Sequence, residues 1–268
     1  MGGYSKQTFL KTALATVVIA GLSFAGGVVA LQASARGGSQ GTAATGHQVR
    51  PRQTPHYDPA NFSPRIDNAW FPLRPGITYI YKGSKDGKSA RDVYRVTHQT
   101  ITIDAVTCRV VKDKLYLKGK LEERTKDYYT QDEDGNVWYF GEDTAELDRH
   151  GHVISREGSW RTGKKGAQAG IFMQADPQVG DQFQQEFLRG HAEDHYKVLT
   201  LAAEVKVPFG HFGRNKLKHN VELTKEWTPL EPKVRDHKFY VRGIGEVKEK
   251  TVKGGHETAR LVRIFFRG

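Results

Sequence analysis

The sequence predicts a mainly β protein: a single antiparallel domain of about ten short strands with few helices, arranged as a curved sheet, a barrel or a sandwich. Three observations predict this class. Apolar and polar residues alternate in several segments, tight-turn sequences separate these segments, and no segment shows the 3.6-residue apolar period of a three-turn amphipathic helix. Alternation of this kind indicates strands with one wet face, which is typical of antiparallel pairing.

The first 35 residues are typical of an exported protein. Lys6 and Lys11 precede an uncharged apolar run over residues 13–31, and small residues over 33–35 follow it. This order predicts a signal peptide that is cleaved near residue 35. The run is also close to the roughly 20 residues that a membrane span requires, so an uncleaved N-terminal anchor stays open. Both interpretations predict a secreted or cell-envelope protein, with membrane contact only if the segment is uncleaved.

A spacer and one folded domain follow. Residues 36–60 begin with a stretch rich in Gly, Ser, Thr and Gln that has no apolar period, which predicts a flexible spacer. The β-rich domain is predicted over residues 61–268, where large apolar side chains begin. Its single cysteine, Cys108, rules out an internal disulfide, and the strand alternation around it predicts a buried thiol.

The folded part is strongly basic. Removal of residues 1–35 leaves 233 residues and takes the formal charge from +11 to +9, because that segment holds two lysines and no acid. A basic excess favours anionic partners, here an anionic polymer, a carbohydrate or a lipid. Positive and negative side chains are interspersed, and we find no clear nucleic-acid motif.

Turn sequences and alternation locate the strands. Turns are predicted at residues 85–88, 118–120, 134–136, 243–245 and 253–255. Residues 166–172 predict a short helical or irregular excursion. Over residues 221–228 alternation predicts a strand with one wet face. Val221, Leu223 and Trp227 lie on the apolar side, with Lys225 as the exception, opposite Glu222, Thr224, Glu226 and Thr228.

One short segment predicts a metal site. On a strand, His191, Glu193 and His195 would project from one face, roughly 6.5 to 7 Å apart at each step of two residues. Two imidazoles and a carboxylate can hold Zn²⁺ or another divalent ion with a bound water, and Asp236 or His237 could complete the set. Such a site would support metal-assisted hydrolysis. The alternative is a polar strand end with no cofactor.

Aromatic residues on the predicted wet faces form a second candidate site. We expect ligand binding by Tyr128, Trp138, Trp227 and Tyr240, with Glu226 beside them. Aromatic rings can stack on sugars or bases, and neighbouring Lys or Arg add cation–π contacts. The alternative is that these rings are buried because both faces of their strands are covered.

Three segments resemble an uncharacterised family of exported, β-rich bacterial proteins. They are residues 66–76 (IDNAWFPLRPG), residues 128–143 (YYTQDEDGNVWYFGED) and residues 224–232 (TKEWTPLEP). The resemblance spans most of residues 61–264. It implies export and a β-rich fold, and it brings no activity with it. It also implies that Glu193 and Asp194 are structural or ligand-facing carboxylates, which weakens the metal hypothesis.

Three functions are therefore compared. The leading hypothesis is an exported non-catalytic binding module that presents aromatic and basic residues on a concave β-surface to an anionic or amphipathic extracellular ligand. The first alternative is a metal-assisted hydrolase that uses His191, Glu193 and His195. The second is a cell-surface structural domain held by an uncleaved anchor.

Overall fold

The computed structural model of this chain describes residues 57–266, so the predicted signal segment and most of the predicted spacer lie outside the described residues. Eighteen strands form in this part of the chain. Five long strands follow one another in the chain: β2 (Ile77–Lys85), β3 (Lys88–Ile103), β4 (Val106–Leu117), β5 (Lys120–Asp132) and β6 (Val137–Leu147). The others are β1 (Phe62–Ser63), β7 (Val153–Ser155), β8 (Trp160–Arg161), β9 (Gln168–Met173), β10 (Gln182–Gln184), β11 (Glu186–Phe187), β12 (His195–Thr200), β13 (Val205–Val207), β14 (Gly210–Phe212), β15 (Val221–Trp227), β16 (Arg235–Val241), β17 (Gly245–Lys253) and β18 (Thr258–Phe266).

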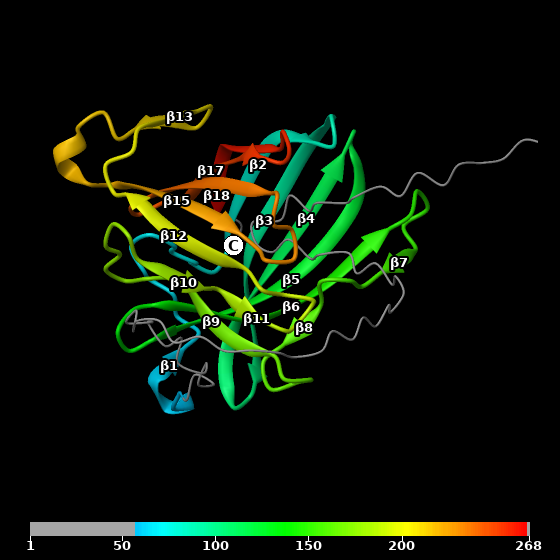
Figure 1. Cartoon of the computed structure of the whole chain (residues 1–268). Coiled ribbons are helices and arrows are strands. Elements are labelled where there is room, and N and C mark those ends of the chain that lie inside the picture. The colour runs from blue at the N-terminus through cyan, green and yellow to red at the C-terminus, as the bar shows by residue number, and fades with distance from the viewer. Residues whose placement is uncertain (1–56, 267–268) are drawn as a thin grey trace, which may run out of the picture.

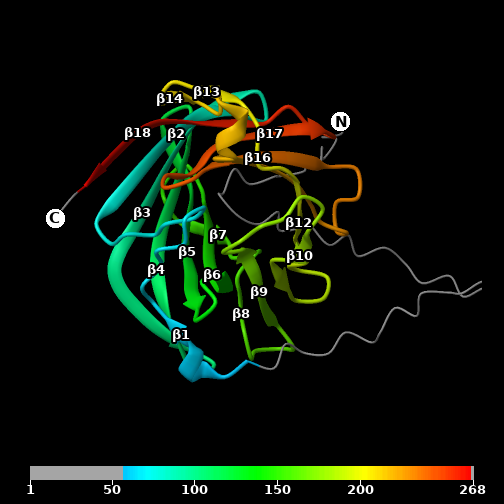
Figure 2. The ribbon, with the colours of Figure 1, turned by 90° about the vertical axis from the view of Figure 1, so that its left-hand side faces the viewer.

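One antiparallel sheet holds sixteen of these strands and curls into a nearly closed barrel (Figure 1, Figure 2). Its path runs β10-β12-β15-β16-β17-β18-β2-β3-β4-β5-β6-β9-β11, and β1, β7 and β8 pair beside it. The two ends of this path, β10 and β11, are separated along the chain only by Gln185. The chain itself therefore joins the two ends of the sheet.

The junction depends on a glycine in β9. A Cβ at Gly170 would lie 2.2 Å from the main-chain oxygen of Gln184, well inside van der Waals contact. Because glycine has no Cβ, the two backbones can approach closely here. The small hairpin of β13 and β14 forms a separate two-stranded sheet at one end of the barrel (Figure 1).

Two predicted turns are confirmed by their backbone geometry. Lys85 pairs with Lys88, and the residues between them, Asp86 and Gly87, have φ angles of 50° and 67°. Positive φ at both central residues gives a hairpin the twist that its strands require. At residues 132–136, the Gly135 N–H donates to the Asp132 carbonyl oxygen at 3.0 Å, which closes the predicted turn before β6.

The main core lies inside the curl of the sheet. It is built from aliphatic residues and from buried tyrosines, among them Tyr79, Tyr81, Tyr94, Tyr129, Tyr139 and Tyr240. A separate cluster contains Cys108, which is fully buried as the sequence predicts. Partly buried side chains of Tyr57 and Phe62, which precede the long strands, pack against that cluster.

The predicted burial of β15 is reversed. Glu222 and Thr224 are fully buried and Glu226 is 7% exposed, whereas Leu223 and Trp227 are only partly buried. Val221 is buried as predicted. Alternation shows which residues share a face of a strand, but it does not show which face the rest of the chain covers. In β15 the covered face carries the carboxyl groups.

Two further expectations are corrected. The sheet has more strands than the predicted ten because many of them have only two or three residues, too few to show alternation. Residues 168–173, which overlap the predicted helical or irregular excursion at 166–172, form β9 through pairing with β6 and β11. Helices in residues 57–266 are two 3₁₀ turns, at Pro59–Asn61 and Lys216–Lys218, and none has the length and apolarity to cross a bilayer.

Candidate functional site

Four cations lie side by side on the outer surface of the barrel. Strand register pairs Lys248 of β17 with Arg260 of β18, Arg260 with Lys82 of β2, and Lys82 with Arg91 of β3. We call these four residues the basic row. Each has at least one buried chain neighbour, such as Ala259 beside Arg260, while Lys82, Arg91 and Arg260 are exposed and Lys248 is partly buried. The basic row therefore points away from the core.

This arrangement is electrostatically unfavourable in the free protein. Neighbouring strands lie about 4.8 Å apart, so four cations occupy roughly 14 Å. Like charges directly opposite each other destabilise a sheet. No salt bridge joins any member of the basic row to an acidic side chain within residues 57–266. The four positive charges of the basic row are therefore not neutralised by salt bridges within these residues.

A second line of basic residues runs beside the first. Lys225 of β15 pairs with His237 of β16, and His237 pairs with Lys250 of β17. Burial lowers the pKa of His237, and Lys225 and Lys250 lower it further while Asp236 opposes them. Burial likewise lowers the pKa of Lys248, and the charges of Lys250 and Arg260 add to that effect. Both pKa values fall in part because positive charge is crowded here.

Aromatic rings alternate with these cations. The Lys225 ammonium lies 4.5 Å from the centroid of the Trp227 ring, and the Lys248 ammonium lies 5.2 Å from that of Phe239. At the other end, the Arg91 guanidinium lies 4.3 Å from the Tyr116 ring centroid. We call the basic row together with these flanking residues the outer basic face. The flanking residues are Lys225, His237, Lys250, Tyr116, Trp227 and Phe239.

The buried groups have the opposite charge. Eleven carboxylic acids and two lysines are buried among residues 57–266. The acids are Asp92, Asp113, Glu123, Asp127, Glu142, Glu186, Asp194, Glu222, Glu226, Asp236 and Glu246, and the lysines are Lys85 and Lys238. Burial raises the pKa of Glu222 to about 8 and those of Asp92 and Glu246 to about 7. At neutral pH these three acids therefore carry less negative charge than exposed carboxylates would.

Of the predicted ligand-binding residues, the structure places Trp227 on the outer basic face. Its ring also stacks on His195, with the ring centroids 5.4 Å apart and the planes at 12°. Glu226 lies on the opposite, buried side of β15, where its carboxylate forms an ion pair with the Lys238 ammonium at 2.9 Å. Tyr240 is fully buried, and its hydroxyl donates to Glu226 at 3.1 Å.

Tyr128 and Trp138 belong to the cluster around Cys108. The Tyr128 hydroxyl donates to an Asp143 oxygen at 2.7 Å, and Tyr128 is 2% exposed. The Trp138 indole N–H donates to Asp132 at 2.7 Å, and its partly buried ring packs against the same cluster. The structure therefore does not bring these two residues together with Trp227.

The predicted metal ligands occupy a turn and a strand end. Only His195 lies in a strand, at the start of β12, so the three side chains do not share one strand face. Glu193 accepts the main-chain N–H of Gly190 at 2.8 Å, which closes the turn that includes His191. Within residues 57–266, no three His, Cys, Asp or Glu side chains are grouped as metal ligands. Of the two residues that could complete the set, His237 lies on the outer basic face. Asp236 lies on the buried face of β16, where its carboxyl accepts a hydrogen bond from the Thr251 hydroxyl at 2.7 Å.

Sequence reasoning missed the members of the basic row. Each stands at a polar position of an alternating segment, which is the normal place for a solvated lysine or arginine. Their significance comes from the strand order, which sets β17, β18, β2 and β3 side by side although residues 82 and 248 are far apart in the chain. The sequence predicted aromatic and basic residues on a concave surface; of the predicted aromatic residues, Trp227 lies beside basic residues on the outer surface.

Comparisons with known proteins find two solved structures of low similarity. No family model and no curated protein sequence matches the chain. One solved structure, from Bacteroides fragilis, is named as an exported protein with a YmcC-like fold. Its sequence is 17% identical to this chain and the TM-score is 0.43. The match covers 74% of this chain and 99% of that one. A structure from Parabacteroides distasonis, whose name describes a lipoprotein, is 9% identical with a TM-score of 0.38 and the same coverage. Neither match transfers an activity or ligand to this chain.

Proposed function

We propose that this chain is an exported, non-catalytic binding module that holds an anionic or amphipathic extracellular ligand on its outer basic face. The observation that supports this function best is the basic row, in which four cations on adjacent strands have no ion-pair partner within residues 57–266. A fold tolerates such local repulsion where function requires it. An anionic ligand would replace the repulsion with charge-assisted contacts.

The aromatic residues favour a ligand with apolar as well as anionic surface. Trp227 and Phe239 lie beside lysines at one end of the face, and Tyr116 lies beside Arg91 at the other. Each ring can contact the apolar face of a sugar or an acyl chain while the neighbouring cation contacts an acidic group. The linear order of the basic row across the strands favours an extended anionic polymer, with an anionic lipid surface as the second ligand to test.

The test compares two triple variants of the full-length protein that change the net charge equally. In the first, Lys82→Gln, Lys248→Gln and Arg260→Gln remove most of the basic row. In the control, Lys164→Gln, Lys206→Gln and Lys233→Gln remove three exposed lysines elsewhere. Binding to dextran sulfate and to phosphatidylglycerol vesicles is measured at low and high salt, with neutral dextran and phosphatidylcholine vesicles as references.

We expect the basic-row variant to lose at least about tenfold in affinity for one of the anionic ligands, which corresponds to about 1.4 kcal/mol. The control variant should lose much less, and wild-type binding should weaken as salt rises because exposed charges are screened. Equal losses in the two variants would show that net charge alone attracts the ligand. Salt-independent binding, or no binding by the wild type, would refute the proposed function.

A further inference from the structure

The basic row continues into an aromatic residue at each end. Strand register pairs Lys248 with Phe239 of β16 beyond one end of the row. It pairs Arg91 with Tyr116 of β4 beyond the other end. Six adjacent strands, β16-β17-β18-β2-β3-β4, therefore carry one aromatic ring, four cations and a second aromatic ring in that order. These strands lie side by side in one wall of the barrel (Figure 1, Figure 2). The line of charge is thus bounded by an aromatic ring at each end.

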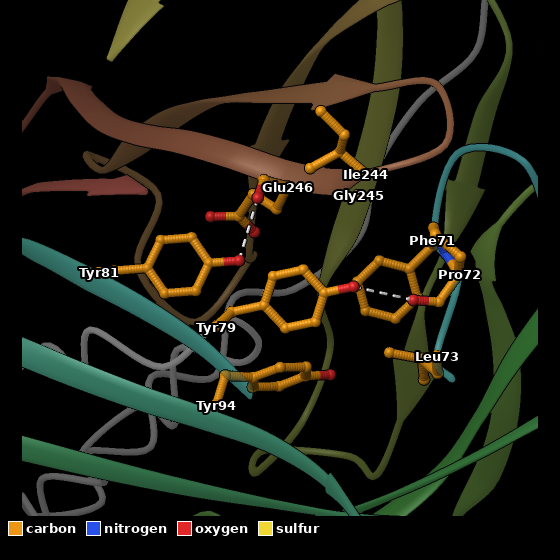
Figure 3. A pocket seen from close by; sticks show the side chains of 9 residues that line it. All are labelled: Phe71, Pro72, Leu73, Tyr79, Tyr81, Tyr94, Ile244, Gly245 and Glu246. Carbon is orange, nitrogen blue, oxygen red and sulfur yellow. Dashed lines mark hydrogen bonds between the residues drawn. The ribbon is translucent and has the colours of Figure 1, made fainter. Parts of the chain in front are cut away.

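Buried tyrosines hold the inner side of the same wall. Tyr79 and Tyr81 of β2 and Tyr94 of β3 lie on that side, and each is at most 4% exposed (Figure 3). The Tyr81 hydroxyl donates a hydrogen bond to the main-chain oxygen of Glu246 at 3.0 Å, which links β2 to β17 across the strand between them (Figure 3). Because the backbone beneath the basic row is held in this way, a ligand that binds there has little backbone to order.

A line of hydroxyl groups borders the basic row, two residues away from it on β18, β2 and β3. Strand register pairs Thr258 of β18 with Ser84 of β2, and Ser84 with Ser89 of β3. The Ser84 and Thr258 hydroxyls lie 3.3 Å apart, and Ser89 is exposed while the other two residues are partly buried. A hydroxyl can both donate and accept hydrogen bonds. The outer basic face therefore offers neutral polar groups beside its charges, which suits a ligand that itself carries hydroxyl groups.

The spacing of the line restricts the ligand further. Neighbouring strands lie about 4.8 Å apart, so the six positions span roughly 24 Å. A chain of pyranose sugars advances by about one strand spacing per sugar. An acidic polysaccharide with one carboxylate per sugar would therefore place about one charge at each strand, and the long lysine and arginine side chains can reach either edge of the sugar chain. A polyphosphate carries its charges more closely and lacks hydroxyl groups and ring faces, and a lipid bilayer has no such linear order.

We propose that the outer basic face binds a linear acidic oligosaccharide with one carboxylate per sugar, laid across the six strands so that each strand contacts about one sugar. The basic row pairs with the carboxylates of the central sugars. Phe239 and Tyr116 contact the ring faces of the sugars at the two ends, and the line of hydroxyl groups bonds to sugar hydroxyls. This inference rests on the proposed function and narrows its ligand to one chemical class.

The test uses three probes of similar length. Hexagalacturonate carries carboxylates on sugar rings, its methyl ester keeps the rings without the charges, and a linear polyphosphate of about six units keeps the charges without the rings. Binding to the full-length protein is measured by isothermal titration calorimetry at low salt. We expect hexagalacturonate to bind at least about tenfold more tightly than either comparison probe. Over galacturonate oligomers of two to eight sugars, affinity should rise up to about six sugars and then change little, because the line has six positions.

Two double variants assign the sugar contacts. Ser84→Ala with Ser89→Ala removes two hydroxyls of the line, and it should lower the affinity for hexagalacturonate relative to polyphosphate by at least about threefold. The control, Thr102→Val with Thr107→Val, removes two exposed hydroxyls at the other end of β3 and β4 and should keep this ratio. Thermal unfolding checks that both variants fold.

The outcomes separate this inference from the proposed function. Affinity for polyphosphate equal to or above that for hexagalacturonate, or an unchanged affinity ratio in the folded serine variant, would overturn the inference and leave the proposed function intact. So would affinity that does not depend on oligomer length, or that rises as steeply from six to eight sugars as below six. Equal affinity for hexagalacturonate and its methyl ester, or no binding of any anionic probe, would refute the proposed function itself.

Discussion

Glu222 makes the stability of this protein depend on pH in an unusual direction. Its side chain is fully buried, and both carboxyl oxygens lack a hydrogen-bond partner within residues 57–266. Burial raises its pKa to about 8, from an ordinary value of 4.5, and the charges of Glu226 and Asp181 add to the effect. The folded state therefore holds a proton on Glu222 at a pH where the unfolded chain has released it.

The sign of the effect follows from this difference. Below the unfolded pKa the carboxyl is protonated in both states, and its contribution to stability is complete. As pH rises from about 5 to about 8, only the unfolded state gains from ionisation, so the folded state loses stability. Because ionisation is partial at both ends of this interval, the difference in bound protons amounts to about 2.5 pH units at 1.36 kcal/mol each, which gives about 3 kcal/mol from Glu222 alone.

The test is the substitution Glu222→Gln, measured by urea unfolding at several values between about pH 5 and pH 8. Wild-type stability should fall over this interval, and the variant should show a fall that is smaller by about 3 kcal/mol. The test uses the change in unfolding free energy between pH 5 and pH 8, not its value at either pH, because the buried amide of the variant lacks partners and costs free energy at every pH. The exposed Glu133→Gln serves as the control and should leave the slope unchanged. A variant slope equal to that of the wild type would refute the reasoning.

Three further predictions concern other parts of the fold. Lys238→Met should destabilise the protein by about 3 kcal/mol at neutral pH, because it leaves Glu226 buried without its ion pair. In urea unfolding, the double variant with Glu226→Gln should recover much of this loss. No recovery would argue against the loss of the ion pair as the cause. Gly170→Ala should cost about 2 to 3 kcal/mol, because its Cβ would collide with the Gln184 main-chain oxygen. Gly190→Ala, which has open space around it and only the strain of a φ of 72°, should cost about 1 kcal/mol in thermal unfolding. Cys108 should resist alkylation by iodoacetamide in the folded protein and react in urea, since the thiol is fully buried and burial raises its pKa to about 12. Equal alkylation rates in the two conditions would contradict its burial.

Local chemistry explains how much of the fold the sequence could predict. The Asp86-Gly87 turn was predictable because two residues that tolerate positive φ stand between alternating segments. Cys108 was predictable because its alternating neighbours are apolar. Strands such as β8 and β11 were not, since two residues contain no period. Their pairing depends on neighbours supplied by distant parts of the chain.

The candidate sites depended more strongly on tertiary structure. Trp227 was predicted as a surface aromatic residue and lies on the outer basic face, but Glu226 and Tyr240 lie in the interior. The alternation in β15 is equally regular whichever face is covered. Because the barrel closes around the side that carries Glu222, the polar side of the strand became the buried one.

The β-rich class, its turns, the basic excess and the buried cysteine all follow from residues that are neighbours in the chain. Pairing between distant strands, in contrast, aligns the cations across β17, β18, β2 and β3 and turns the acids of β15 inward. Strand order and closure are set by packing over the whole sheet, which no local segment encodes. A local pattern fixes which side chains share a face, and the assembled barrel fixes what that face meets.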